Sequence, residues 1–363
     1  MPAKHLALFD RKSIVSRTTQ LAVAIALGLP LAGCIEDYGV DDCSSEDLPV
    51  VENFWAGSDT TDVTFIAFGD TQFGGGAEDK NDLHKIALNE ADLQLDWSSA
   101  GLNEPVANIR GVIMNGDITQ NGRDGRLSSG NEYGGFTRIY GLCGNRDVKF
   151  PLFEGYGNHD FFEWSHIAYR IPKAHPVADS VSVRNEYRVG LSNTAPGKDG
   201  HYSWDWDNVH FVQLNLTPSD IDPNHKVHGV RNPRMALTFL QEDLAQHVAG
   251  TNKKVIIMSH YGPWETFEWD QAQIDALYDS IKDYNVIAYL HGHAHATSAY
   301  TWKGIPVFNV GSPYYLNYNA DGRGHYSVFR ITNDKLYAFD VSWNPAAPTE
   351  LRFPDDWSRE IDL

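Results

Sequence analysis

Acidic, amide and imidazole side chains occur at five points of the chain, each time directly after a short apolar run. These polar segments, in chain order, are residues 69–72 (Gly-Asp-Thr-Gln), 115–117 (Asn-Gly-Asp), 157–160 (Gly-Asn-His-Asp), 259–260 (Ser-His) and 291–295 (His-Gly-His-Ala-His). Carboxylate, amide and imidazole groups are common ligands of divalent metal ions. A pair of such ions, about 3.5–4 Å apart, can clamp the attacking and leaving oxygens of a phosphoester. The residue types therefore indicate metal-assisted phosphoester hydrolysis.

The apolar runs before these segments are typical of buried strands. They cover residues 63–68, 112–114, 152–156, 255–258 and 286–290. An open α/β sheet builds its binding sites beyond the carboxyl ends of its strands. The polar segments are therefore expected where such a site forms.

The elements that must position these groups follow from the remaining pattern. Apolar spacing predicts helices, and alternation predicts a hairpin and late strands. The predicted helices cover 79–95, 233–248 and 271–283, the hairpin 201–216, and the late strands 305–310, 326–331 and 335–341. Residues 120–146 and 161–200 are expected to be long loops or insertions. Early alternation of strands with helices, followed by hairpins, favours two packed sheets flanked by helices.

Each polar residue, taken alone, also has a simpler interpretation. An Asp or Asn after a strand is often a helix N-cap or a turn residue, and His260 alone could be a hydrogen-bonded core residue. His293 and His295 are two positions apart, so on a strand both would face the same side. The chain contains no serine nucleophile elbow, no Gly-rich phosphate loop and no His-Glu-x-x-His motif. Taken jointly, the residues favour a two-metal centre.

The ordered set resembles the calcineurin-like metallophosphoesterase superfamily. The family pattern is Asp-x-His, Gly-Asp, Gly-Asn-His-Asp or -Glu, a lone His, and Gly-His-x-His, and the resemblance extends over about residues 63–312. It implies a four-layer α/β/β/α sandwich of two mixed sheets flanked by helices. It also implies hydrolysis of a phosphomonoester or phosphodiester by a hydroxide that two metal ions activate.

The resemblance also implies roles for individual residues. The implied metal ligands are Asp70, Gln72, Asp117, Asn158, His260, His293 and His295. Asp117 would bridge both ions. The first ion would be held by Asp70 and His295, and the second by the remaining Asn and His ligands. His159 would face the phosphate as a catalytic group, and Asp160 would orient His159.

Gln72 departs from the family pattern, which usually has His at this position. Its amide oxygen could bind the first ion directly, or Gln72 could only form hydrogen bonds nearby. An oxygen-rich first position favours Mn²⁺, with Mg²⁺, Fe²⁺, Zn²⁺ or Ca²⁺ as alternatives.

The N-terminus has the features of an export signal. A basic leader precedes an apolar stretch over 21–31, which is shorter than the roughly 20 residues of a membrane span. Leu31-Ala32-Gly33-Cys34 resembles a bacterial lipobox, although an ordinary signal peptide with a chance cysteine is the alternative. Acylation of Cys34 would provide the membrane contact. The outer membrane or cell surface is then favoured over the periplasmic face of the inner membrane.

These features divide the chain into a signal peptide (1–33), an acidic tether (34–62), a phosphoesterase domain (63–345) and a C-terminal tail (346–363). Cys43 and Cys143 could form a disulfide in an oxidising compartment, or remain as thiols.

The bulk composition limits the partners. Hydrophobic residues make up 42% of the 363 residues, enough for a sizeable core, and the net charge is −19. Such a charge argues against nucleic-acid binding. A small phosphorylated substrate or a phospholipid head group is expected instead. The aromatic segment 261–269 could line a substrate pocket or serve only in packing. A surface binding protein on an inactive phosphoesterase scaffold is the alternative function.

Overall fold

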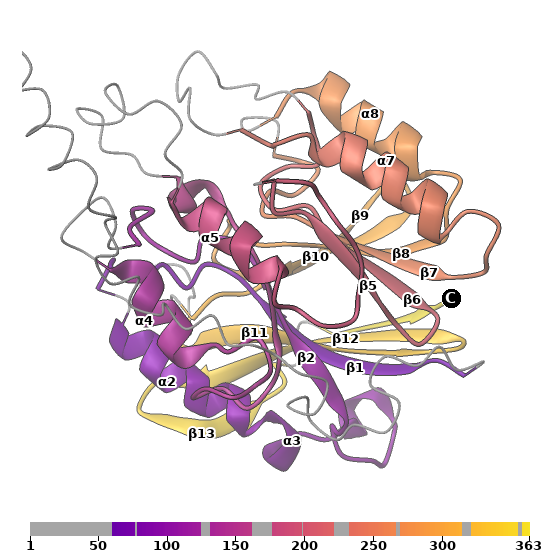
Figure 1. Cartoon of the computed structure of the whole chain (residues 1–363). Helices are drawn as coiled ribbons and strands as arrows, with labels where there is room; N and C mark the ends of the chain where they lie inside the picture. Colours follow the sequence, from indigo (N-terminus) through magenta and orange to yellow (C-terminus); the bar gives the residue numbers. More distant parts are fainter. Residues whose placement is uncertain are drawn as a thin grey trace, which may run out of the picture. The chain divides into compact units, whose positions relative to one another are not determined.

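The computed structural model describes residues 60–76, 78–124, 131–161, 176–197, 199–220, 232–265, 269–313, 321–354 and 358–363. The predicted signal peptide and nearly all of the predicted tether lie outside this part of the chain. Cys143 is disulfide-bonded, whereas Cys43, the partner that the sequence suggests, lies outside the described residues. Two seven-stranded mixed sheets form the centre of the fold (Figure 1).

The first sheet carries the three N-terminal strands of the predicted site. Its order is β13-β12-β11-β1-β2-β3, and β14 also pairs with β12. The strands are β1 (Asp62–Phe68), β2 (Ile109–Asn115), β3 (Leu152–Gly155), β11 (Gly324–Thr332), β12 (Lys335–Asn344), β13 (Ala347–Arg352) and β14 (Ser358–Asp362). β1, β2 and β3 run parallel, so their carboxyl ends lie at one edge.

The second sheet carries the other two strands of the site. Its order is β4-β5-β6-β7-β8-β10-β9. The strands are β4 (Leu191–Thr194), β5 (Tyr202–Trp206), β6 (Val209–Gln213), β7 (Lys254–Met258), β8 (Val286–His291), β9 (Thr297–Trp302) and β10 (Ile305–Val310). β6, β7 and β8 are parallel, whereas β5 and β6 form the predicted hairpin.

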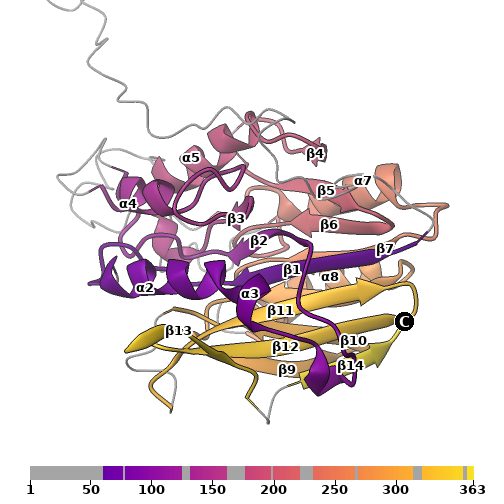
Figure 2. The same ribbon diagram turned by 90° about the horizontal axis from the view of Figure 1, so that it is seen from below.

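Helices cover the outer face of each sheet, which gives four layers (Figures 1 and 2). Buried residues of α2 (Glu78–Asn89), α3 (Ala91–Gln94), α4 (Glu132–Ile139) and α5 (Pro176–Asn185) pack on the first sheet. Those of α7 (Ala236–His247) and α8 (Gln271–Ile281) pack on the second sheet. The predicted α/β/β/α sandwich of two mixed sheets is confirmed. No helix of the described residues combines the length and apolar character of a membrane span.

The residues of β1 show why the site strands are apolar throughout. Val63, Phe65 and Ala67 belong to the core between the two sheets. Ile66 and Phe68 point to the other face, into the core beneath the helices. Successive side chains of a strand alternate between its faces, so a strand buried on both faces is a continuous apolar run.

Two regions predicted as loops contain regular structure. Residues 120–146 contain α4, whose first turn is capped by the Asn131 side chain at the Gly134 N–H, 2.7 Å away. The region 161–200 contains α5 and β4. The paired glycines Gly134 and Gly135 obscured the helical pattern, because glycine is a poor helix former.

The prediction of a C-terminal tail over residues 346–363 is wrong. Residues 347–352 and 358–362 are strands β13 and β14, which both pair with β12. They lie at the edge of the sheet and are largely exposed, so they lack the apolar runs that reveal buried strands. The folded unit therefore continues to the last residues of the chain.

Candidate metal centre

The five polar segments follow the carboxyl ends of β1, β2, β3, β7 and β8, as the sequence predicts. Backbone hydrogen bonds tie the loops together within the first sheet: Asp70 N–H donates to the Gly116 carbonyl at 2.9 Å, and Gln72 N–H donates to that of Asp117 at 3.0 Å. A side chain connects the two sheets, because Nδ1 of His260 lies 2.8 Å from the Asn115 carbonyl oxygen. The edges of both sheets thus form one site.

The first group of candidate ligands consists of Asp70, Asp117 and His295. One ligand atom of each lies within 4.8 Å of the others, and all three residues are buried. Nε2 of His295 is 3.3 Å from Oδ1 of Asp70. Two carboxylates and an imidazole at this spacing can hold a divalent cation.

The second group shares Asp117 with the first. Asp117, His260 and His293 also offer ligand atoms within 4.8 Å of one another. Nε2 of His260 lies 3.3 Å from Oδ1 of Asp117 and 2.9 Å from Oδ1 of Asn158. One carboxylate common to two ligand groups is the arrangement that a bridged pair of cations requires.

Gln72 lies inside the first group. Its Nε2 is 3.5 Å from Oδ2 of Asp117 and 3.3 Å from Nε2 of His295, and only 3% of the residue is exposed. The O and N ends of an amide are nearly equivalent in shape. A half-turn of the amide would therefore present Oε1 to the same space. The position is compatible with direct ligation.

Five of the seven predicted ligands have left-handed backbone conformations. Their φ angles are 57° for Asp70, 42° for Gln72, 53° for Asp117, 70° for His293 and 54° for His295. Residues other than glycine rarely adopt this backbone conformation, because it costs roughly 1 kcal/mol of conformational free energy per residue. The two-residue spacing of His293 and His295 suggested that both lie on a strand. They do not, because β8 ends at His291. Loop conformation, and not strand alternation, turns both into the site.

Two glycines leave room for the carboxylates. A Cβ on Gly157 would lie 2.3 Å from Oδ1 of Asp117, and one on Gly292 would lie 2.8 Å from Oδ2 of Asp70. Any side chain at these positions would displace the ligand groups.

The buried charges of the site shift the pKa values of its residues. Burial raises the pKa of Asp117, but the charges of His260 and His159 outweigh burial and hold that pKa well below its usual range. Burial lowers the pKa of His260, but the Asp117 charge dominates and raises it to about 10. A cation bound here would take the place of such a proton. Burial lowers the pKa of His293 to about 3, so its imidazole is neutral, the form that binds metals. The residues therefore fit two divalent cations.

His159 lies beside the shared carboxylate. Its backbone N–H donates to Oδ1 of Asp117 at 2.8 Å, and its ring Nε2 is 4.0 Å from Oδ2 of the same residue. Its ring Nδ1 lies 2.9 Å from the carbonyl oxygen of Gln120. An N–H at Nδ1 can donate to that carbonyl, which directs Nε2 toward the centre. Gln120 is thus a site residue that the sequence analysis missed, because no motif marks a carbonyl acceptor.

Asp160 has a different role from the predicted one. Its carboxylate accepts hydrogen bonds from the N–H groups of Gly157, Ile118 and Thr119, at 2.8–3.0 Å, and from the Thr119 hydroxyl at 2.8 Å. The short turn Asn158–Asp160 directs the side chain back toward Gly157. The prediction that Asp160 orients the His159 ring is therefore wrong. Asp160 instead fixes the backbone that follows Asp117 and joins it to Gly157 of its own loop.

His291 and the aromatic segment contribute packing. The ring of His291 is buried against Tyr300, whose hydroxyl is 3.2 Å from Nε2. Tyr261 and Trp269 are also buried, whereas Trp264 is 54% exposed. Of these aromatics, only Trp264 is open to a bound molecule. Residues 266–268 lie outside the described part of the chain.

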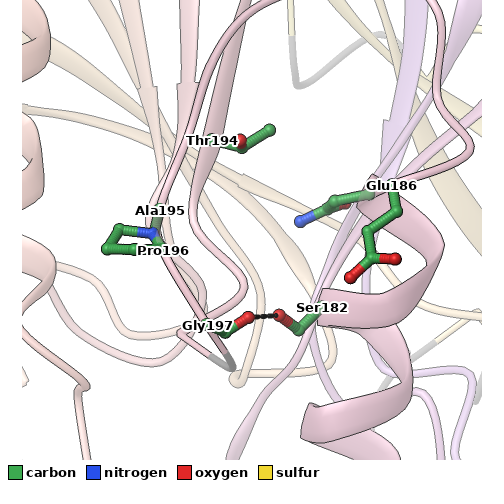
Figure 3. Close-up of a pocket in the computed structure, with 7 residues that line it drawn as sticks. Ser182, Glu186, Thr194, Ala195, Pro196 and Gly197 are labelled. Atoms are coloured by element: carbon green, nitrogen blue, oxygen red, sulfur yellow. Dashed lines mark hydrogen bonds between the residues drawn. The ribbon is translucent and has the colours of Figure 1, made fainter.

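A separate pocket of about 240 Å³ lies between α5 and the loop after β4 (Figure 3). It is lined by Ser182, Asn185, Glu186, Thr194, Ala195, Pro196 and Gly197. The Ser182 hydroxyl donates to the Gly197 carbonyl across it, at 2.9 Å. None of the predicted ligands lines this pocket, so it is distinct from the metal centre.

Comparison with known proteins identifies a family and a fold. The family model of calcineurin-like phosphoesterases matches residues 63–297. Among solved structures, GAP50, the anchor in the inner membrane complex of Plasmodium, is 12% identical with a TM-score of 0.51, over 84% of this chain and 89% of that chain. A dimetal phosphatase from Danio rerio is 13% identical with a TM-score of 0.47, over 80% and 98%. At these identities the likeness concerns the fold alone. No curated protein sequence matches the chain.

Proposed function

The chain belongs to the calcineurin-like phosphoesterase family, and from this premise we propose that it hydrolyses phosphomonoesters or phosphodiesters with two divalent cations. The observation that carries the proposal is the pair of buried ligand groups that share Asp117. When bound, the cations would polarise the phosphoryl group and make water nucleophilic near neutral pH.

The chain's own residues would bind and orient the reactants. Asp70, Gln72 and His295 would hold the first cation, and Asn158, His260 and His293 the second, with Asp117 between them. The side chain of His159 is partly exposed beside this group, and Gln120 fixes its Nδ1. A proton on Nε2 of His159 would be in position to pass to the leaving oxygen. Asp160 would hold the Asp117 loop in place.

Metal removal tests the function and the identity of the cations. We propose Mn²⁺ for the first position, because Asp70, Gln72 and Asp117 supply oxygen and only His295 supplies nitrogen. Chelated protein should hydrolyse neither a chromogenic phosphomonoester nor a phosphodiester, and Mn²⁺ should restore more activity than Zn²⁺. The better substrate of the two would assign the protein as a monoesterase or a diesterase.

A different outcome would favour the alternative function. If the protein binds cations but hydrolyses neither ester with Mn²⁺, Mg²⁺, Fe²⁺, Zn²⁺ or Ca²⁺, a surface binding protein on a phosphoesterase scaffold becomes the better proposal. If Zn²⁺ restored the most activity, only the proposal that the first cation position is oxygen-rich and prefers Mn²⁺ would be contradicted.

The setting of the enzyme is a proposal from the sequence alone. Leu31-Ala32-Gly33-Cys34 supports an exported protein anchored by an acylated Cys34, at the outer membrane or cell surface. Its substrate would be a small phosphorylated molecule or a phospholipid head group. Cys34→Ser should leave the membrane fraction or remain uncleaved, as measured by fractionation and by the mass of the product. Normal processing with full membrane retention would refute the anchor.

A further inference from the structure

The turn that follows His260 places a buried carboxylate against the metal centre. Residues 262–265 read Gly-Pro-Trp-Glu, and the Glu265 N–H donates to the Gly262 carbonyl at 3.1 Å. In return, the Gly262 N–H donates to Oε2 of Glu265. The indole N–H of Trp269 also donates to the Gly262 carbonyl, at 3.1 Å. The first and third contacts fix the turn, and the Gly262 N–H holds one oxygen of the Glu265 side chain, of which about 6% is exposed.

The other carboxylate oxygen of Glu265 faces His293. Oε1 lies 4.0 Å from Nε2 of His293, too far for a direct hydrogen bond but within reach of one bridging water. The ring of Tyr261 packs edge-on against His293, with centroids 4.6 Å apart. The His293 N–H donates to both carboxylate oxygens of Asp70, at 3.2 and 3.0 Å. Backbone, ring face and ring nitrogen of His293 thus each have a defined neighbour.

Glu265 does not belong to either ligand group. The group around His293 is completed by Asp117 and His260, whose ligand atoms lie within 4.8 Å of it. A carboxylate next to a metal-binding imidazole, but outside the ligand set, commonly holds the ring orientation and raises the basicity of the ligand.

We propose that Glu265 is a positioning residue for His293: its carboxylate fixes the imidazole orientation and strengthens binding of the cation that Asp117, His260 and His293 hold. This inference rests on the proposed function, because it needs a cation at that position. Glu265 would act through His293 and would not touch the substrate.

A role confined to the shape of the turn is the competing explanation, and Glu265→Gln separates the two. The glutamine amide oxygen can still accept the Gly262 N–H, so the turn is retained, whereas the negative charge beside His293 is lost. Glu242→Gln is the matched control, because Glu242 is exposed on α7.

The test is a calorimetric titration of the chelated whole protein with Co²⁺, together with the visible absorption spectrum of the bound Co²⁺. Wild type and Glu242→Gln should bind two ions. Glu265→Gln should bind one of them roughly 10–100-fold more weakly, with an altered Co²⁺ spectrum and an unchanged melting temperature. Unchanged affinity and spectrum in Glu265→Gln would overturn the proposal.

A second variant covers the case in which Glu265→Gln does not fold. Glu265→Asp keeps the charge but withdraws it from His293 by one methylene, so weaker binding of one ion at an unchanged melting temperature supports the proposal and wild-type binding refutes it. Wild-type protein that binds no ion would refute the proposed function itself. Two ions bound equally by wild type and the Glu265 variants would refute only this inference.

Discussion

Asp117→Asn is expected to reduce kcat/KM by roughly 10³-fold or more, equivalent to about 4 kcal/mol of lost transition-state stabilisation. Asp117 is fully buried and belongs to both ligand groups. An amide keeps the shape of the side chain but removes the negative charge that two cations would share. The metal content of the purified protein, measured by mass spectrometry, should fall together with the activity.

The control for this variant is Asp279→Asn. Asp279 is exposed on α8 and pairs only with Lys282 in the described contacts, and surface ion pairs contribute little. Activity and metal content should therefore match those of wild type. If the Asp117→Asn protein bound two metals and had wild-type turnover, Asp117 would not be a ligand of the metal centre.

His159→Ala is expected to separate chemistry from metal binding. The side chain belongs to neither ligand group, and its Nε2 lies 4.0 Å from Asp117. Turnover should fall about 10²–10⁴-fold, the usual scale for a lost acid–base group. Metal content and melting temperature should remain those of wild type.

The leaving group offers an internal control for His159. An ester whose leaving group is already a weak base needs little protonation, so His159→Ala should impair it less than an alkyl ester. Loss of the metals from His159→Ala would instead assign His159 to the ligand set and contradict a proton-transfer role.

The buried part of the fold was predictable because its strands are apolar on both faces. All five runs before the polar segments are strands, and the helices at 233–248 and 271–283 correspond to α7 and α8 within a few residues. Polar edge strands carry no such signal, so the pattern of apolar runs does not identify β13 and β14. β9 was missed for the same reason, since most of its residues are only partly buried.

The sequence could predict that these polar residues lie together because each segment follows a strand, and strand ends of the two sheets meet. Their roles as metal ligands are implied by the family resemblance and stay a prediction. The contacts that orient those residues could not be predicted from the sequence. Gln120 acts through its carbonyl oxygen, and Glu265 reaches His293 only because the turn after β7 folds back on itself. The sequence pairs Asp160 with its neighbour His159, whereas the local turn directs the Asp160 carboxylate to the Thr119 N–H. Tertiary geometry decides such pairings.

The left-handed backbone at five candidate ligands affects how the sequence can change during evolution. These residues are Asp70, Gln72, Asp117, His293 and His295. At roughly 1 kcal/mol each, these positions together cost a sizeable fraction of the 5–15 kcal/mol that stabilises a typical domain. Cations that bind only the folded state would offset this cost. Glycine adopts this region without strain, so a descendant that abandoned hydrolysis would no longer need to keep ligand side chains in this conformation. Backbone angles at ligand positions therefore offer a way to distinguish working phosphoesterase centres from relics, independently of any motif.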